Sequence, residues 1–399
     1  MKYIILVPDG MADEPVAELG NKTPLQAAHT PNMDFFARNG LSALVQTIPA
    51  GMPPGSDIGN LSLMGYDPKV NFSGRAPLEA ASMGVDLKKD EVAFRCNLIT
   101  EDDGIMDDYS AGHITTDEAK LLIQEMQHKV DWPDATFYPG KSYRHLLVLK
   151  PIDMAAMLKI KTTPPHDILN QPLKKYLPHG PQSDILLNLM ERSKSILSNH
   201  QINRTRLDLK EKPGNMIWLW GQGPRPNLPL FKDAYGLTGS VISAVDLVNG
   251  IGILAGLDII SVPGANGYYD TNYAGKAAYA LESLKKHDFV YVHVEAPDEA
   301  GHNGDAQAKK ECIESFDRLV AGAVREYMEK NPDVRVLVSP DHPTPVARRT
   351  HTSNPVPFAI CGAGIASNGA KEYSEAEAAT KGVKFSSGQE MVKFFLKEN

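Results

Sequence analysis

The sequence predicts an α/β fold in which a mostly parallel sheet is flanked by helices and interrupted by an inserted α+β domain. Strand and helix patterns alternate toward the C-terminus, as in sheets built from βα units. Between about residues 86 and 213 this texture gives way to a different mixture of strands, amphipathic helices and prolines. Three apolar runs rich in β-branched residues have the character of buried parallel strands, namely residues 3–7, 289–294 and 334–338.

The first domain is expected to be discontinuous and to comprise residues 1–85 and 214–399. Its first strand ends at Pro8 and delivers Asp9 to the carboxyl end of the sheet, where open α/β sheets place their ligands. Its other expected elements are a helix at 31–39, the loop carrying Ser56, a strand at 216–220, the alternating segment 241–260 and a helix at 273–286.

Residues 86–213 are expected to form the inserted domain. Residues 91–100 and 141–150 have the pattern of strands, and residues 117–128 and 183–197 have the pattern of amphipathic helices. Proline-rich stretches, TTPPHD and YLPHGPQ, lie between them. An insertion into a discontinuous domain is the simplest explanation for the two changes in sequence pattern, near residues 86 and 213.

The composition excludes several classes of protein. Lys and Arg total 41 against 49 acidic residues, a net charge of -8 with no basic tract, which argues against nucleic acid or an anionic membrane as the main partner. Cys96, Cys312 and Cys361 lie far apart, so neither a disulfide framework nor a zinc knuckle is indicated. Neither a signal peptide nor a membrane-spanning run is expected. The expected location is the cytoplasm, and the sequence does not indicate an oligomeric state.

Acidic and imidazole side chains follow each of the three apolar runs. Because parallel strands end at one edge of a sheet, these side chains are expected to meet in one crevice. Asp298 and His302 are four residues apart, which suits one helical turn. The candidate metal ligands are Asp9, Asp298, His302, Asp341, His342 and His351.

Each part of this set also has an ordinary interpretation. An Asp after a first strand is often only a turn residue or a helix cap, and a lone Asp-x-x-x-His arises by chance in many proteins. The whole set in this order favours a site for two divalent cations. Mixed carboxylate and imidazole ligands suit Mn²⁺ or Zn²⁺.

Ser56 is the candidate nucleophile. It follows MPPG, which forces a sharp loop, and precedes DIGNLSLMGYD, whose apolar spacing predicts a short helix. Its hydroxyl is therefore expected near a helix N-terminus, where free N–H groups favour an anion. A serine at this place can also be a plain N-cap. A bound cation favours the nucleophile, because it lowers the pKa of the hydroxyl.

Longer strings carry a family resemblance over nearly the full chain. PDGMAD, PGSDIGNLSLMGYDP, SGRAPLEAASMGV, FRCNLIT, WLWGQG, EAPDEAGHNGD and SPDHPTP resemble the archaeal type of cofactor-independent phosphoglycerate mutase, within the alkaline phosphatase superfamily. The resemblance implies an alkaline-phosphatase-like fold with a cap, two Mn²⁺ or Zn²⁺ ions and a transiently phosphorylated serine, which maps onto Ser56. It assigns Asp9, Ser56, Asp341 and His342 to one ion, and Asp298, His302 and His351 to the other.

A mutase has to keep water away from its phosphorylated intermediate, which gives the inserted domain a reason to act as a closing cap. The expected substrate is a small phosphorylated hydroxy acid. Guanidinium groups bind two oxygens of a carboxylate or phosphate together. An ordinary surface charge or ion pair is the alternative for each candidate. The candidate substrate-binding residues are Arg75, Arg95, His113, Arg144 and Lys276.

Other functions remain open from the residues. His113 stands where archaeal members are expected to carry arginine, and Gly59 where alanine is common, which leaves the substrate open. A homoserine kinase of the same family is the alternative, although no GxxxxGK[ST] string is present. The Cys-or-Ser-x-Pro-x-Arg signature of sulfatases is absent. A metal-binding scaffold without activity would be expected to lack a ligand or the serine, and none is missing.

Overall fold

The computed structural model describes residues 1–130 and 132–397. These residues form two compact units. Unit 1 comprises Met1–Phe72 and Leu228–Asn399, and unit 2 comprises Ser73–Asn227. The chain therefore leaves unit 1 once, forms unit 2 and returns to unit 1.

The inserted unit is longer at both ends than the predicted 86–213. α5 (Arg75–Ser82) packs against β3 (Val92–Asp102) and β7 (Met216–Pro224), so this helix belongs to unit 2. β7 pairs antiparallel with β3, which places the strand predicted at 216–220 in unit 2 rather than in the discontinuous domain. The boundaries of the inserted unit therefore differ from the predicted 86–213. They depend on strand pairing between distant segments, which the local sequence pattern does not reveal.

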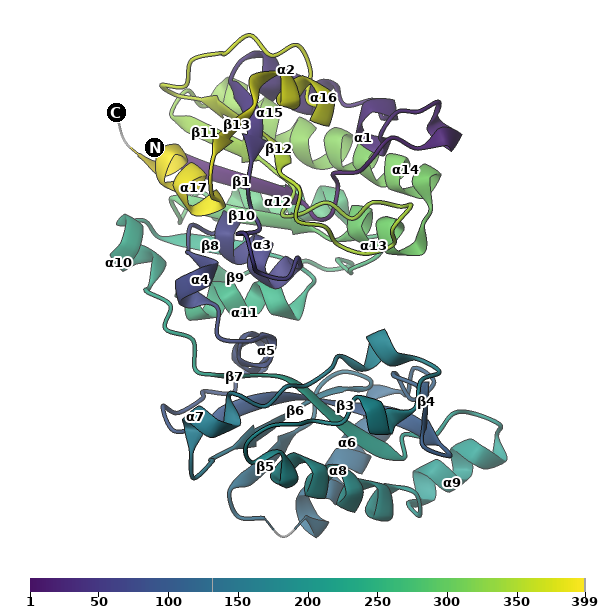
Figure 1. Ribbon diagram of the computed structural model, residues 1–399. Coiled ribbons are helices and arrows are strands. Elements are labelled where there is room, and N and C mark those ends of the chain that lie inside the picture. Colours follow the sequence, from purple (N-terminus) through teal and green to yellow (C-terminus); the bar gives the residue numbers. More distant parts are fainter. Residues whose placement is uncertain (131, 398–399) are drawn as a thin grey trace. The chain divides into compact units, whose positions relative to one another are not determined.

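Unit 1 is built on an eight-stranded sheet, and its mostly parallel character agrees with the prediction (Figure 1). β12 runs antiparallel to both of its neighbours, and the other neighbouring pairs are parallel. The strands lie in the order β13 (Val383–Phe385), β2 (Leu41–Val45), β12 (Val356–Gly362), β11 (Val334–Val338), β1 (Lys2–Pro8), β10 (Phe289–Val294), β8 (Gly239–Ile242) and β9 (Asp258–Ile259).

The three apolar runs become the adjacent strands β11, β1 and β10. β10 and β11 agree residue for residue with the predicted runs, and β1 is one residue longer at each end. Leu6 of β1 pairs with Val292 on one side and with Val338 on the other. Nearly all of their side chains are buried, which explains why these strands read as continuous apolar runs.

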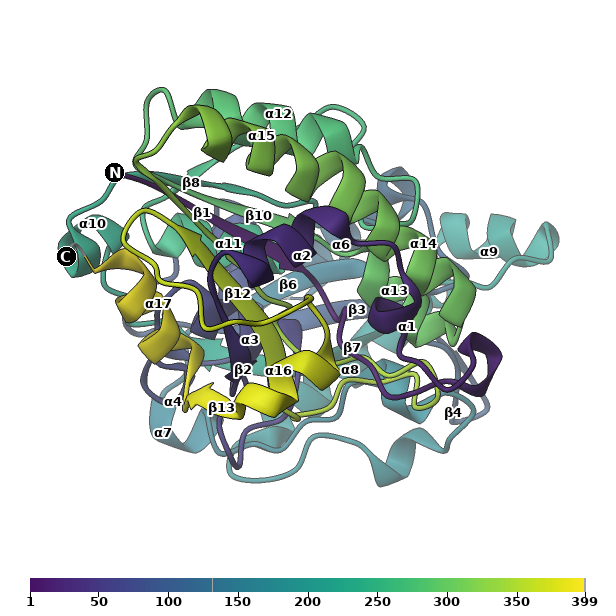
Figure 2. The same ribbon diagram turned by 90° about the horizontal axis from the view of Figure 1, so that it is seen from above.

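Helices cover both faces of this sheet (Figures 1 and 2). One face carries α2 (Pro31–Arg38), α12 (Tyr273–Ser283) and α15 (Gly322–Lys330), and the other carries α3 (Ser56–Leu63), α11 (Asp246–Leu254) and α17 (Gly388–Leu396). The remaining helical segments are η1 (Ala17–Leu19), α1 (Pro24–Ala27), α4 (Pro68–Asn71), α10 (Phe231–Tyr235), α13 (Ala296–Asn303), α14 (Ala306–Phe316), η4 (Asp317–Ala321) and α16 (Glu375–Lys381).

Unit 2 is an antiparallel α+β structure. Its strands lie in the order β4 (Ile105–Asp108), β3, β6 (Arg144–Leu149) and β5 (Ala135–Tyr138), and β7 also pairs with β3. Alternate residues of β3 face opposite sides: Phe94 joins the larger core, while Ala93 packs in the cluster that includes α5. The other helical segments of unit 2 are α6 (Thr116–Lys129), α7 (Met154–Met157), η2 (Pro165–Ile168), η3 (Leu173–Lys175), α8 (Ser183–Leu197) and α9 (Gln201–Asp208).

Local signals set the ends of the predicted helices. α6 begins with a capping box, in which the Thr115 side chain accepts from the Glu118 backbone and the Glu118 side chain accepts from the Thr115 backbone.

Cys96, Cys312 and Cys361 are buried free thiols. Within residues 1–130 and 132–397, every helix is too short or too polar to cross a membrane.

Candidate metal centre and nucleophile

All six predicted carboxylate and imidazole ligands lie in unit 1, near the carboxyl ends of its central strands. Because β11, β1 and β10 are parallel neighbours, the segments that follow them begin at the same edge of the sheet. The predicted ligands are Asp9 directly after β1, Asp298 and His302 on α13 after β10, Asp341 and His342 after β11, and His351 later in the loop between β11 and β12.

Asp298, His302 and His351 form one cluster of donor atoms. The Nε2 atoms of the two histidines lie 2.9 Å apart. Asp298 Oδ2 is 3.2 Å from His302 Nε2, and Asp298 Oδ1 is 3.6 Å from His351 Nε2. Donors bound about 2.0–2.1 Å from a tetrahedral cation lie roughly 3.3 Å apart, so these spacings match the edges of one coordination shell.

The tautomer of His302 suits metal binding. Its Nδ1 lies 3.1 Å from the carbonyl oxygen of Arg349, which can only accept, so Nδ1 carries the hydrogen and Nε2 is directed at the cluster. Burial opposes a positive charge on this ring, but the hydrogen bond and charge of Asp298 outweigh burial and raise the pKa of His302 to about 9. A proton and a cation therefore compete for Nε2.

Asp9, Asp341 and His342 form a second cluster, and all three side chains are fully buried. His342 Nε2 lies 3.5 Å from Asp9 Oδ1 and 3.4 Å from Asp341 Oδ2. The His342 ring also packs against the His351 ring, with centroids 4.2 Å apart. His342 is therefore within reach of both clusters, and it also falls in a possible ligand group with Asp298 and His351.

The donor set fits divalent cations. Asp9 Oδ1 is buried and has no hydrogen-bond partner among the described residues. Burial raises the pKa of Asp9 well above its usual value, and the negative charges of Asp341, Glu295 and Asp298 raise it further. Buried carboxylates in such close contact call for positive charge between them. Imidazole together with carboxylate matches the preferences of Mn²⁺ or Zn²⁺ better than those of Ca²⁺.

Ser56 lies beside the second cluster. It is the first residue of α3, and Gly55, not Ser56, occupies the N-cap position, so the plain N-cap interpretation is wrong. Ser56 Oγ is 3.1 Å from His342 Nε2. The hydroxyl thus stands both at a helix N-terminus, where backbone N–H groups favour an anion, and within hydrogen-bond distance of a candidate ligand.

Two further residues join the centre that the sequence analysis did not identify, His293 and Glu295. His293 Nε2 is 2.8 Å from Asp9 Oδ2 and 3.6 Å from Glu295 Oε2. Its Nδ1 lies 3.1 Å from Ser243 Oγ, and burial lowers the pKa of His293 to about 3, so the ring is neutral. The available signal was a pair of polar residues at the end of an otherwise apolar run, FVYVHVE.

Asn60 holds the aspartate of one cluster against the nucleophile helix. Its Nδ2 donates to Asp341 Oδ2 at 2.8 Å and to the carbonyl oxygen of Ser56 at 2.9 Å. Tyr291 in β10 donates to Asn60 Oδ1 at 2.7 Å, which orients the amide. The relative positions of Ser56 and Asp341 are therefore fixed by buried hydrogen bonds.

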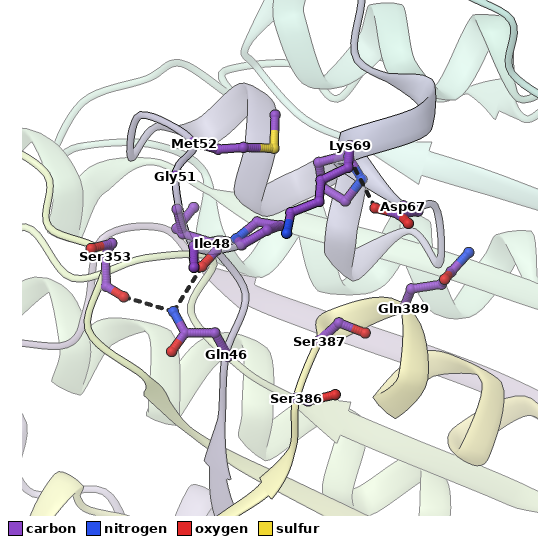
Figure 3. A pocket seen from close by; sticks show the side chains of 13 residues that line it. Gln46, Ile48, Gly51, Met52, Asp67, Lys69, Ser353, Ser386, Ser387 and Gln389 are labelled. Atoms are coloured by element: carbon purple, nitrogen blue, oxygen red, sulfur yellow. Dashed lines mark hydrogen bonds between the residues drawn. The ribbon is translucent and has the colours of Figure 1, made fainter.

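Gln46 connects the loop that contains Ile48 to the loop that contains Ser353 (Figure 3). Gln46 Nε2 donates to the carbonyl oxygens of Ile48 and Ser353, each at 2.7 Å. These residues line a surface pocket of about 500 Å³ whose lining includes none of the candidate metal ligands. The pocket is therefore separate from the metal centre. The hydrogen bonds of Gln46 in its lining join the loop before Ser56 to the loop after His351.

The predicted substrate residues are divided between the units. Lys276 is in unit 1, where it is fully buried and donates to the carbonyl oxygen of His293 at 2.8 Å. Burial lowers the pKa of this lysine to about 8, against the opposing charge of Glu295. Lys276 therefore supports the strand end that carries His293 and Glu295.

Three arginines of unit 2 lie close enough to influence one another. Arg95 pairs with Glu79 at 2.9 Å and stacks over Trp220, 4.2 Å from the ring centroid. Its pKa falls to about 10, chiefly through burial, with smaller contributions from the positive charges of Arg75 and Arg144. Arg75 reaches the same Glu79 at 3.5 Å.

Arg144 and His113 are more exposed. The Arg144 guanidinium lies 5.3 Å from the Tyr143 ring centroid, and the residue is exposed. His113 lies in an exposed turn with a φ of 53°, where its backbone N–H donates to Ser110 Oγ at 3.2 Å. Arg75, Arg95 and Arg144 therefore lie near one another, whereas His113 lies in an exposed turn.

Known proteins share this architecture. A family model described as 2,3-bisphosphoglycerate-independent phosphoglycerate mutase matches residues 37–203. A protein of that name from Methanothrix thermoacetophila is 49% identical over 397 residues, which cover 99% of this chain and 100% of the relative.

Two solved structures are similar to this one over nearly the whole chain. The PH0037 protein of Pyrococcus horikoshii has a TM-score of 0.82 at 29% identity and covers 100% of this chain and 98% of its own. The cofactor-independent phosphoglycerate mutase of Thermoplasma acidophilum has a TM-score of 0.67 at 27% identity, covering 99% of both chains. With the sheet, the ligand clusters and the serine in place, this chain belongs to the 2,3-bisphosphoglycerate-independent phosphoglycerate mutase family.

Proposed function

We propose that this protein interconverts 3-phosphoglycerate and 2-phosphoglycerate through a phosphoserine at Ser56. The observation that carries the proposal is the position of Ser56 Oγ, 3.1 Å from His342 Nε2 and at the N-terminus of α3. Family membership supports the substrate, and the relatives reported above give no support to the homoserine kinase alternative.

The proposed centre holds two divalent ions, Mn²⁺ or Zn²⁺. Asp9, Ser56, Asp341 and His342 would bind one, and Asp298, His302 and His351 the other. The donor distances within each cluster and the unpartnered Asp9 Oδ1 support this assignment. When bound, such ions lower the pKa of a coordinated hydroxyl and neutralise phosphoryl oxygens.

The chain's own residues supply the nucleophile and its positioning. Ser56 Oγ attacks the phosphorus atom, the bond from phosphorus to the 3-oxygen breaks, and that oxygen takes up a proton. The 2-hydroxyl of the same glycerate then attacks the phosphoserine, and Ser56 recovers its proton. No nucleotide is consumed, because the phosphoryl group only changes oxygens. Asn60 keeps Ser56 and Asp341 in register throughout.

Arg75, Arg95, His113, Arg144 and Lys276 are proposed to bind or surround the substrate. Their present contacts suggest different duties. Arg144 is exposed, and its planar fork is available for a carboxylate or a phosphate. Arg95 is already engaged by Glu79 and Trp220, and Lys276 by the backbone of His293, so both suit support of the site. The cytoplasm is the proposed location, which three unpaired thiols support.

The experiment is a coupled assay. Purified protein loaded with Mn²⁺ is mixed with 3-phosphoglycerate and enolase, without 2,3-bisphosphoglycerate, and phosphoenolpyruvate is followed by absorbance. Steady product formation is expected, with none from Ser56→Ala. Turnover by Ser56→Ala at the native rate would refute the phosphoserine route. Activity only with homoserine and ATP would refute the mutase assignment.

A further inference from the structure

Every polar atom of Thr344 makes a hydrogen bond to a residue of the proposed metal centre or to a residue next to it. Its side chain is fully buried. Oγ1 donates to Asp298 Oδ1 and lies 3.2 Å from His342 Nδ1. Its backbone N–H donates to the carbonyl oxygen of Gly10, next to Asp9, at 3.2 Å. Thr344 therefore touches a proposed ligand of each ion and the backbone beside a third ligand.

The direction of these hydrogen bonds follows from the chemistry of the groups. The carboxylate of Asp298 only accepts, so the single hydrogen of the Thr344 hydroxyl goes to Asp298. The hydroxyl oxygen then accepts from His342, which requires the hydrogen of that imidazole to be on Nδ1. His342 Nε2 is left with its lone pair on the side of Ser56, Asp9 and Asp341.

The surroundings hold Thr344 in this place. Lys309 Nζ donates to its carbonyl oxygen at 2.8 Å. A Cβ on Gly10 would come within 2.6 Å of Thr344 Oγ1, and a Cβ on Gly301 would overlap Thr344. Glycine at both positions allows the two neighbouring segments to approach the threonine closely.

We propose that Thr344 is a positioning residue that couples the two metal sites through the hydrogen-bonded chain His342–Thr344–Asp298. The hydroxyl fixes the ligating tautomer of His342 and, with the same atom, orients the carboxylate of Asp298. Loss of the hydroxyl therefore weakens both sites at once. The inference rests on the proposed two-ion centre, because it assigns Asp298 and His342 to different ions.

Three variants of the full chain test this coupling. Thr344→Val keeps the volume but removes the hydroxyl, and Thr344→Ser restores it. The control is Thr47→Val, because Thr47 is equally buried and its hydroxyl has no hydrogen-bond partner among the described residues. Stepwise Co²⁺ dissociation constants are measured by competition with a chelator, and the d–d absorption bands report the geometry of each site.

Thr344→Val is expected to bind both ions roughly 10- to 100-fold more weakly, the usual effect of losing a hydrogen bond to a metal ligand. Its Co²⁺ spectrum should change, while Thr344→Ser and Thr47→Val retain native constants and bands. Native constants in Thr344→Val, weakening of one ion alone, or failure of Thr344→Ser to restore binding would overturn the proposal. Native protein that binds fewer than two ions would instead refute the proposed centre.

A second measurement does not depend on any variant of Thr344. ¹⁵N chemical shifts of histidine-labelled native protein distinguish a protonated from an unprotonated Nδ1. The expected result is a hydrogen on Nδ1 of His342. The signal of His342 is identified because it disappears from the spectrum of His342→Gln. An unprotonated Nδ1 would overturn the hydrogen-bonded chain, even if Thr344→Val did not fold.

Discussion

Lys309 Nζ lies 2.8 Å from Asp13 Oδ2, and both side chains are completely buried. The same ammonium group donates to the carbonyl oxygens of Thr344 and Ala12. It thus joins α14 to the segments that follow β1 and β11, both of which carry proposed ligands. A buried pair in this position affects stability and the metal centre together.

Lys309→Met is expected to lower the free energy of unfolding by about 3–5 kcal/mol, because it leaves the Asp13 carboxylate buried without its partner. Urea denaturation measures the change. The double variant Lys309→Met/Asp13→Asn should regain part of the loss, since no unpaired charge remains. Lys310→Met, at a partly exposed neighbouring lysine, serves as control. A loss below about 1 kcal/mol in Lys309→Met would refute the role of the pair.

Gly10→Ala is expected to reduce both stability and metal affinity. Gly10 has a φ of 59°, and an added Cβ would lie 2.6 Å from Thr344 Oγ1 and 2.8 Å from Asp298 Cα. The matched control is Gly20→Ala, where φ is 68° and no heavy atom lies within 4 Å. The control should show only backbone strain, about 1–2 kcal/mol in denaturation. Equal effects of the two variants would contradict the steric argument.

Glu375 is expected to make stability depend on pH. Burial raises its pKa to about 6, although hydrogen bonds from Thr23 and Asp13 oppose the shift. Because the folded pKa lies above the unfolded one, the carboxyl contributes stability below pH 4.5 that is lost as pH rises through 6.

Denaturation of native protein and Glu375→Gln at several pH values checks this. The native protein should gain about 1–2 kcal/mol relative to the variant as pH falls from 7 to 4.5. A constant difference between the two proteins would show that Glu375 has the same pKa folded and unfolded.

Removal of divalent ions is expected to abolish activity and lower thermal stability. Added Mn²⁺ at about 100 times its dissociation constant should restore roughly 2.7 kcal/mol for each site, since the ligands converge only in the folded state. Differential scanning calorimetry of chelator-treated protein measures this. Ser56→Ala should retain most of the stabilisation, because carboxylates and imidazoles supply most ligands. Stability unaffected by chelation would count against the two-ion centre.

Arg144 and Arg95 are expected to differ when replaced by methionine. Arg144→Met should raise KM at least about tenfold with little change in stability, because an exposed guanidinium is lost. Arg95→Met should also destabilise unit 2, since it removes the pair with Glu79 and the stacking on Trp220. Steady-state kinetics and denaturation separate the two outcomes. An unchanged KM in Arg144→Met would remove it from the substrate residues.

The sequence predicted the central strands, and it singled out six acidic and imidazole residues that the structure brings together at one edge of the sheet. β10 and β11 could be bounded to the residue because strands buried on both faces are apolar at nearly every position, with His293 and Arg335 as the exceptions here. Asp9, Asp298 and Asp341 could be recognised because each follows such a run and belongs to a small set of metal-binding residue types. These are local properties, and a single segment of chain carries each of them.

His293, Thr344 and the extent of unit 2 required the tertiary structure. The polar pair His293 and Glu295 ends an apolar run, but this local signal does not show what the pair contacts. Thr344 lies between two prolines and carries no such signal. Their roles come from contacts with Asp9, Asp298 and His342, and β7 joins unit 2 through pairing with β3. Hydrophobic periodicity and ligand chemistry are written along the chain, whereas hydrogen bonds between distant segments exist only once the strands are ordered.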